Sequence, residues 1–188
     1  MSATTPGRII LLNGASSAGK SSLARALQRQ LAEPFWHWSI DHLMAARVLP
    51  HERIDSGEFA WAAMRAAFFD GFHRSIPALT AAGNDLIVEH IVETCEWMQC
   101  LLALLAPFDV FFVGVRCPLH ELERRERERG DRRPGSARED DATTHAFGAY
   151  DFEVDTTSAP ADALASEVLR AWNARRHPGA FARLAQRG

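Results

Sequence analysis

The chain has 188 residues, 47% hydrophobic and 24% charged, a composition that is typical of one compact globular domain and argues against long disorder. Its 21 basic and 24 acidic side chains give a formal net charge of -3, so no basic excess indicates a nucleic acid or a membrane surface as partner. No apolar run reaches the roughly 18 residues of a membrane span, and the first residues lack the pattern of a signal peptide. We therefore expect a cytoplasmic protein with one domain over residues 1–188.

The first half of the chain alternates apolar runs with helical periodicity. A continuous apolar run over 8–13 precedes a glycine turn, which predicts a central parallel strand covered on both faces. The helical spacing that starts at Lys20 ends near Glu33, because Pro34 cannot continue a helix. Further predicted elements of this half are a strand over 35–40, a helix over 41–49, a long helical stretch over 58–82 that divides before Pro77, and a strand over 86–90.

The second half continues the same alternation. Its predicted elements are a helix over 93–105, a strand over 110–115, a charged helix over 118–129, a loop over 130–135, a strand over 152–155 and a helix over 161–174. Strands that alternate with helices predict an α/β fold of the P-loop NTPase type, with a parallel sheet, helices on both faces and a small arginine-rich lid. Ligands bind beyond the carboxyl ends of such strands, so Gly14, Asp41, Glu89 and Arg116 are expected to face one crevice.

A phosphate-binding loop is indicated by residues 14–21, which match the pattern G-x-x-x-x-G-K-[ST] between a strand and a helix. Backbone N–H groups of such a loop surround phosphate oxygens at a helix N-terminus. Lys20, the only lysine of the chain, would neutralise the β and γ phosphates, and the Ser21 hydroxyl would bind magnesium. The predicted cofactors are ATP and Mg2+, and the predicted nucleotide site comprises Gly14, Ala15, Ser16, Ser17, Ala18, Gly19, Lys20, Ser21 and Ser22.

Asp41 follows the second predicted strand, which we expect beside the strand of the glycine loop. A carboxylate at that place would take the proton of an acceptor hydroxyl and direct its oxygen at the γ phosphate. The structural alternative is that Asp41 caps a helix that begins at His42.

Glu89 ends the third predicted strand and is a candidate for orienting magnesium through a bound water. We expect the neighbouring His90 to be a packing residue. Asp109 precedes its strand and is therefore expected at the opposite end of the sheet from the metal.

Alternating charges fill the stretch 121–133, where glutamate and arginine pair four residues apart and most side chains are expected on a solvated helix face. Its last arginines flank Gly130 and Pro134, so a lid over about 125–136 is predicted there. From this lid Arg129, Arg132 and Arg125 would place guanidinium groups on the transferring phosphoryl group.

Four blocks of the sequence resemble the chloramphenicol phosphotransferase-like P-loop kinases: IILLNGASSAGKSS, IDHL around Asp41, VGVRC with RERERGDR, and HAFGAYDFEVDTT. The resemblance implies ATP-dependent phosphorylation of a small alcohol, with Asp41 as general base and Arg125, Arg129 and Arg132 as lid arginines. The chain departs from the family between Leu43 and Trp61 and at Glu89 and His90, regions that shape the acceptor pocket.

Several hypotheses remain for the identity of the acceptor. We favour a small, partly apolar alcohol such as chloramphenicol, which Trp36, Trp38, Trp61 and Phe68 would suit. The other kinase hypotheses have a nucleoside, a shikimate-like or a sugar-nucleotide acceptor and require converging polar side chains. Apart from Arg65, Asp70, His73 and Arg74, the stretch 58–82 is mostly apolar, which favours an aromatic or apolar acceptor. A nucleotide-binding regulator without transferase activity is the alternative from another class.

Overall fold

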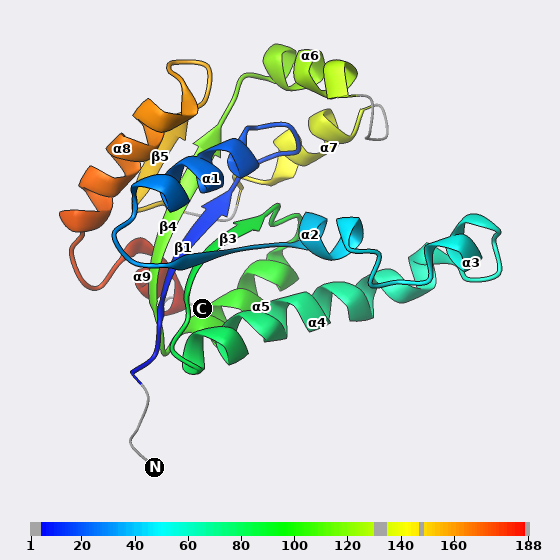
Figure 1. Cartoon of the computed structure of the whole chain (residues 1–188), viewed down its shortest axis with the longest axis horizontal. Coiled ribbons are helices and arrows are strands. Elements are labelled where there is room, and N and C mark those ends of the chain that lie inside the picture. The colour runs from blue at the N-terminus through cyan, green and yellow to red at the C-terminus, as the bar shows by residue number, and fades with distance from the viewer. Residues whose placement is uncertain (1–4, 130–134, 147–148, 187–188) are drawn as a thin grey trace.

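The computed structural model describes residues 5–129, 135–146 and 149–186. In these ranges five parallel strands form one sheet in the order β2-β3-β1-β4-β5 (Figure 1). The strands are β1 (Arg8–Asn13), β2 (Phe35–Ser39), β3 (Asp85–His90), β4 (Asp109–Arg116) and β5 (Phe152–Asp155). The predicted parallel sheet with β1 at its centre is confirmed.

Helices cover both faces of the sheet, as expected (Figure 1). The helices of the described residues are α1 (Lys20–Gln30), α2 (Ile40–Ala45), α3 (His51–Asp55), α4 (Trp61–Ala81), α5 (Cys95–Leu105), α6 (Leu119–Arg129), α7 (Ser136–Thr143), α8 (Ala161–Asn173) and α9 (Ala180–Ala185). Helices α1 and α8 pack on one face, and α4, α5 and α9 pack on the other. None of these helices combines the length and the apolar character needed to cross a membrane.

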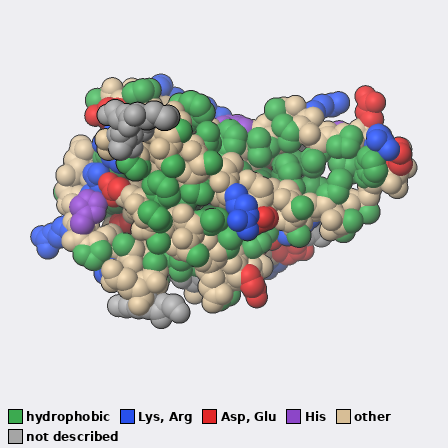
Figure 2. Space-filling view, turned by 90° about the horizontal axis from the view of Figure 1, so that it is seen from below, with side chains coloured by type: hydrophobic (Ala, Val, Ile, Leu, Met, Phe, Trp, Pro, Cys, Tyr) green, Lys and Arg blue, Asp and Glu red, His purple; other side chains and the backbone are tan. Residues whose placement is uncertain are grey.

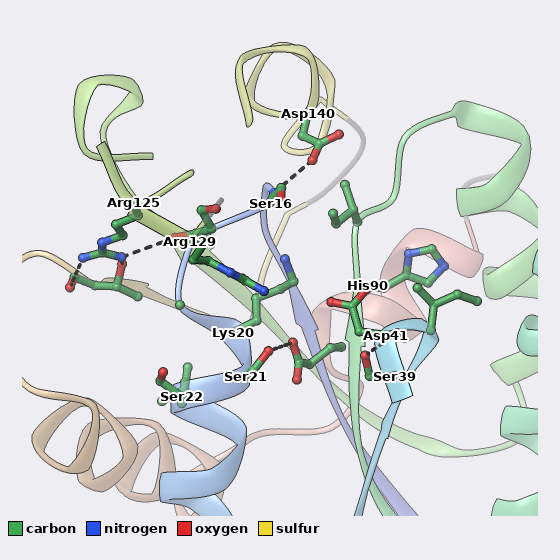
Figure 3. Close-up of a pocket in the computed structure, with 18 of the residues that line it drawn as sticks. Ser16, Lys20, Ser21, Ser22, Ser39, Asp41, His90, Arg125, Arg129 and Asp140 are labelled. Atoms are coloured by element: carbon green, nitrogen blue, oxygen red, sulfur yellow. Dashed lines mark hydrogen bonds between the residues drawn. The ribbon is translucent and has the colours of Figure 1, made fainter. Parts of the chain in front are cut away.

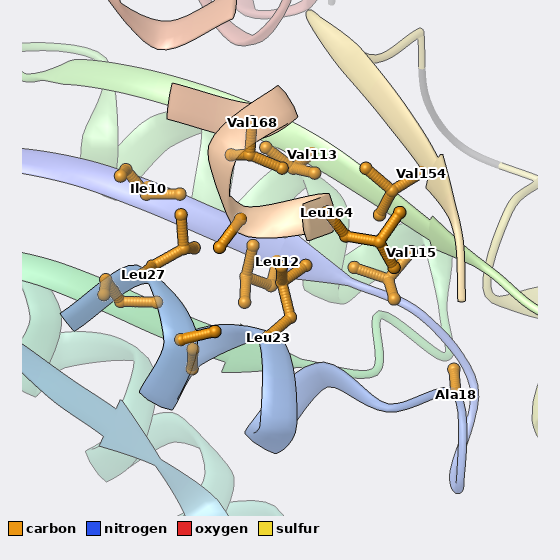
Figure 4. Packing of buried hydrophobic residues seen from close by; sticks show 14 of the residues in the cluster. Ile10, Leu12, Ala18, Leu23, Leu27, Val113, Val115, Val154, Leu164 and Val168 are labelled. Carbon is orange, nitrogen blue, oxygen red and sulfur yellow. The ribbon is translucent and has the colours of Figure 1, made fainter. Parts of the chain in front are cut away.

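The core is divided in two by the sheet, and β1 shows why. Side chains alternate between the faces of a strand, so Ile10 and Leu12 meet α1 and α8, while Ile9 and Leu11 meet α4 and α5. All four side chains have no exposed surface. Figure 4 shows the first of the two clusters, where Leu23 of α1 packs with residues of the strands and of α8. A strand buried on both faces needs a continuous apolar run, as this one has.

The strand order corrects one expectation, because β3 and not β2 lies beside β1 on this side of the sheet. β3 has Leu86, Ile87 and Val88 fully buried, whereas β2 exposes Trp36 by 48%. The more apolar strand therefore takes the inner position, and β2 takes the edge. Asp41 consequently follows the edge strand, with Glu89 between it and the glycine loop.

α4 also differs from expectation, since it continues through Pro77 as one helix of 21 residues. A proline inside a helix costs about 3 kcal/mol. Phe72 and Ile76 on one side of the proline and Thr80 on the other are buried, and this burial offsets the cost.

Helix α3 and the beginning of α4 extend away from the body of the molecule (Figure 1). Figure 2 shows apolar side chains gathered on this arm, while charged side chains lie singly or in small groups over the same face. Val48, between α2 and α3, is 55% exposed. The arm carries the start of α4 to one side of the site described next.

Candidate nucleotide and acceptor site

A cleft of about 1240 Å³ lies at the carboxyl ends of the strands. The glycine loop and α1 form one wall, and α2, the first half of α4 and the end of β3 form the other. Figure 3 shows the site from close by, with Ser21 on the first wall and Asp41 and His90 on the second. The predicted crevice is present, with Asp41 and Glu89 in its lining, but Gly14 and Arg116 are not among the residues that line it. Arg116 pairs instead with Glu153, at 2.6 Å.

Two glycines explain the path of the phosphate-binding loop. A Cβ atom at Gly14 would lie 2.5 Å from the carbonyl oxygen of Val115, so only glycine allows the loop to leave β1 so close to β4. Gly19 has a φ of 86°, in the left-handed region that favours glycine, and α1 begins directly after it. The loop therefore directs its backbone N–H groups at the space in front of a helix N-terminus.

Lys20 lies across this loop and is only 8% exposed. Its Nζ donates hydrogen bonds to the carbonyl oxygens of Gly14 and Ala15, both at 2.8 Å. The Ser17 hydroxyl is buried and has no hydrogen-bond partner among the described residues. A nest of N–H groups, an ammonium and an unpaired hydroxyl fits the phosphates of a nucleotide.

Glu89 is 5% exposed and joins the loop to the edge strand. Its Oε2 accepts a hydrogen bond from Ser21 Oγ at 2.9 Å, and its Oε1 pairs with Nε2 of His37. Burial acts to raise the pKa of Glu89, but the hydrogen bonds from His37 and Ser21 and the charge of Lys20 hold this pKa below its ordinary value. Glu89 is thus an anion beside the serine expected to bind magnesium.

This donor set is compatible with Mg2+, which usually keeps several waters and takes only one or two protein oxygens besides the phosphates. The described residues contain no group of three or more His, Cys, Asp or Glu side chains that could hold a metal ion. Ser21 and Glu89 therefore fit a metal that arrives with a nucleotide. They do not form a cage that would bind a metal alone.

Asp41 lies in the first turn of α2 but does not cap it. Ser39 is the N-cap, and its hydroxyl accepts a hydrogen bond from the Asp41 backbone N–H at 3.1 Å. The structural alternative for Asp41 is therefore wrong. In Figure 3 the side chains of Asp41, Lys20 and Arg129 point toward the same open space.

Two of the three expected lid arginines lie in the described part of the chain, and both line the cleft. Arg125 lines the cleft, and its position is fixed because it donates hydrogen bonds to Glu121 at 2.7 Å and to Thr156 at 3.0 Å. Arg129 also lines the cleft. Arg132, which we also predicted as a lid arginine, lies outside the described residues.

Glu126 was expected on a solvated surface, and this expectation is wrong. Its carboxylate is 6% exposed and accepts hydrogen bonds from the backbone N–H groups of Gly135 and Ala137, both at 2.8 Å. These donors begin α7, a helix that the sequence analysis did not predict. A carboxylate supplied by another helix therefore caps α7.

The wall opposite the glycine loop is aromatic. Of the four aromatic residues that we expected near the acceptor, only Trp61 lines the cleft. Trp36 is half-exposed at the sheet edge, and Trp38 packs on Phe72 and donates to Ser75. The two other aromatic residues of this wall, Phe69 and Phe72, were not predicted from the sequence.

His90 lines the same wall and pairs with His73 of α4, with 2.7 Å between their Nε2 atoms. Both rings are buried, and burial lowers the pKa of His90 to about 3 and that of His73 to about 4. The two rings are neutral near pH 7. His90 is thus a packing residue, as expected, but it also contributes to the cleft.

A family model described as "Chloramphenicol phosphotransferase-like protein" matches residues 7–173. The "putative O-phosphotransferase" of Mycobacterium tuberculosis H37Rv is 36% identical over 208 residues, which cover 100% of this chain and 92% of that protein. The chain belongs to the chloramphenicol phosphotransferase-like family. It is a phosphotransferase of the P-loop kinase kind, as its glycine loop and its resemblance to this family predicted.

Solved structures support the fold of this family member. The APS kinase CysC of Mycobacterium tuberculosis, in complex with AMPPNP and APS, has a TM-score of 0.67 at 20% identity and covers 89% of this chain and 98% of its own. The shikimate kinase of Acinetobacter baumannii, in complex with shikimate, has a TM-score of 0.57 at 15% identity and covers 92% of this chain and 97% of its own. The predicted P-loop kinase fold is confirmed.

Proposed function

We propose that the protein transfers the γ phosphate of ATP, in the presence of Mg2+, to a hydroxyl group of a small molecule, with Asp41 as general base. Chloramphenicol or a related compound is the first candidate acceptor. One observation carries the proposal: Asp41 points into the cleft opposite Lys20, on the wall where aromatic side chains gather. The acceptor hydroxyl then lies between a proton acceptor and the bound phosphates.

The glycine loop holds the phosphates through backbone N–H groups, and Lys20 neutralises the charge on the β and γ phosphates. Ser21 would bind magnesium, and Glu89 would orient a water on it. A bound magnesium ion would offset negative charge that shifts during transfer. The expected lid arginines Arg125 and Arg129 would add positive charge near the transferring group.

Asp41 accepts the proton of the acceptor hydroxyl as the acceptor oxygen forms its bond to the γ phosphorus. The bond between this phosphorus and the bridging oxygen breaks, and its electron pair leaves with ADP. The products are a phosphate monoester, ADP and a proton that Asp41 later returns to water. Residues 1–188 act as a single kinase domain in this proposal.

ADP release tests the proposal with a panel that contains chloramphenicol, a nucleoside, shikimate and simple aromatic alcohols. We expect Asp41→Asn to lower kcat by about 100-fold or more, since general base catalysis contributes roughly 10²–10⁴-fold, while ATP affinity is retained. Lys20→Ala should lower kcat and should also weaken ATP binding. Asp70→Asn is the matched control, because Asp70 lies on the outer side of α4 in a pair with Arg74.

Full turnover by Asp41→Asn would exclude Asp41 as the base. If no alcohol stimulates ADP release although ATP binds, the kinase proposal for this panel is wrong. A nucleotide-binding regulator then becomes the better hypothesis.

A further inference from the structure

A histidine of the edge strand reaches the carboxylate that lies beside the phosphate-binding loop. His37 of β2 lies opposite Ile87 of β3, and Glu89 is two residues further along β3. Residues two apart on a strand point to the same face of a sheet, so Glu89 shares with Ile87 the face that α1 covers. The side chain of His37 meets Glu89 on this face, where Nε2 of His37 pairs with Oε1 of Glu89.

The chemistry of the two partners gives the direction of this hydrogen bond. Glu89 is an anion, and a carboxylate anion can only accept hydrogen bonds, so Nε2 of His37 is the donor. Burial acts to raise the pKa of Glu89, and the hydrogen bond from His37 is the largest of the effects that hold this pKa below its ordinary value. If His37 were removed, Oε1 of Glu89 would lose its donor in a buried position, which costs free energy.

The other oxygen of Glu89 determines the orientation of the Ser21 hydroxyl. Ser21 Oγ donates its one proton to Oε2 of Glu89 at 2.9 Å, a bond that Figure 3 draws as a dashed line. A hydroxyl has one proton and two lone pairs, so the lone pairs of Ser21 remain for another partner. A lone pair is what a magnesium ion takes from the serine of a phosphate-binding loop.

The ring of His37 is held in place from the cleft side. Its side chain is 7% exposed, and the ring of His42, which lines the cleft, packs edge-on against it with 4.4 Å between the ring centres. His37 itself is not among the residues that line the cleft. Any effect of His37 on a bound nucleotide would therefore pass through Glu89.

We infer that His37 is a positioning residue of the magnesium site, which fixes the carboxylate of Glu89 and, through it, the direction of the lone pairs of Ser21. The inference rests on the proposed function, because it assumes that magnesium binds at Ser21 together with the nucleotide. It differs from a merely structural role in one measurable respect. Loss of the donor should weaken nucleotide binding in the presence of magnesium and should change it little in the absence of magnesium, because the backbone N–H groups of the loop still hold the phosphates.

Calorimetry on the full chain tests the inference with a non-hydrolysable ATP analogue, whose dissociation constant is measured once with Mg2+ and once with EDTA. The ratio of the two constants gives the factor by which metal and nucleotide strengthen each other's binding. His37→Phe keeps a ring but removes the donor. We expect this ratio to fall about tenfold, since residues that orient metal ligands change metal affinity by roughly 10- to 100-fold.

Two amide variants separate the hydrogen bond from the shape of the ring. His37→Gln can donate from a place close to that of Nε2 and should keep most of the ratio. His37→Asn is one methylene shorter, cannot reach Glu89 and should behave like His37→Phe. The matched control is Trp38→Phe, which changes the next residue of β2, on the other face of the sheet, removes its hydrogen bond to Ser75 and should leave the ratio unchanged.

The inference is overturned if His37→Phe and His37→Asn keep the ratio, if they weaken binding equally with and without Mg2+, or if His37→Gln loses as much as His37→Asn. An analogue that binds the unchanged protein equally well with Mg2+ and with EDTA would overturn both the inference and the proposed use of magnesium. Product detection by mass spectrometry is a separate readout. A ratio that falls in His37→Asn, without a phosphorylated product from any alcohol, would keep the role of His37 and reject the proposed transfer.

Discussion

At Glu89, one buried carboxylate connects a hydroxyl of the phosphate-binding loop with a histidine of the edge strand. If Glu89 orients a magnesium-bound water, Glu89→Gln will keep the shape but lose the charge that favours the metal. We expect the Mg2+ concentration for half-maximal ADP release to rise about tenfold, the lower end of the effect of residues that orient metal ligands. The measurement is a magnesium titration at saturating ATP.

Glu153→Gln is the control for this experiment, since it makes the same change on β5, where Glu153 pairs with Arg116 away from the cleft. An unchanged magnesium requirement in Glu89→Gln would contradict the role of Glu89. A loss of kcat at every magnesium concentration would instead indicate damage to the loop itself.

The sequence predicts a site residue when a short stretch of the chain contains the pattern that identifies it. Lys20 and Ser21 lie in a pattern of fixed spacing. Asp41 follows β2 and Glu89 lies near the end of β3, and the carboxyl ends of parallel strands meet at one edge of the sheet. His37 was not predicted as a site residue, because its contact with Glu89 depends on which strand lies at the edge of the sheet. That order is decided by burial across the whole sheet and has no local signal.

At the scale of elements, a hydrogen bond joins α7 to the nucleotide site. Asp140 Oδ2 accepts a hydrogen bond from the Ser16 backbone N–H at 3.0 Å, in a loop whose N–H groups bind phosphate. Its negative charge therefore opposes that of the phosphates. We expect Asp140→Asn to bind ATP about fivefold more tightly, an effect on the order of 1 kcal/mol for one screened charge pair, as measured by calorimetry.

Asp141→Asn removes the same charge one residue further along α7 and serves as the control for net charge. Affinity that rises equally in both variants would show a general electrostatic effect. Weaker binding in Asp140→Asn alone would mean that Asp140 supports the loop and does not compete with phosphate.

Helices with a long periodic pattern of apolar residues and strands with a continuous apolar run were predicted from the sequence. The sequence did not reveal α7, because its cap comes from Glu126 of another helix. Helix α9 docks because Asp151 accepts a hydrogen bond from the Ala180 backbone N–H and Phe181 is buried. Contacts of this kind join residues far apart in the chain, so no window of the sequence contains them.

At the scale of the whole molecule, buried neutral histidines make the fold sensitive to acid. Burial lowers the pKa of His73 to about 4, of His90 to about 3 and of His145 to about 4. In the unfolded chain a histidine has its ordinary pKa, near 6.5. Between about pH 6.5 and 4 the unfolded state therefore binds more protons than the folded state, and the free energy of unfolding falls as the pH falls.

For one histidine whose folded pKa is about 4, the loss between pH 7 and pH 5 is on the order of 2 kcal/mol. Urea denaturation at these two pH values measures it. We expect His73→Gln, which retains a hydrogen-bonding side chain next to His90, to lose about 2 kcal/mol less stability over this interval than the unchanged protein. His120→Gln, an exposed position on α6, should show the full loss. If His73→Gln and His120→Gln show equal losses, carboxylates and not the buried histidines dominate the acid response, since protonation of paired carboxylates also destabilises a fold.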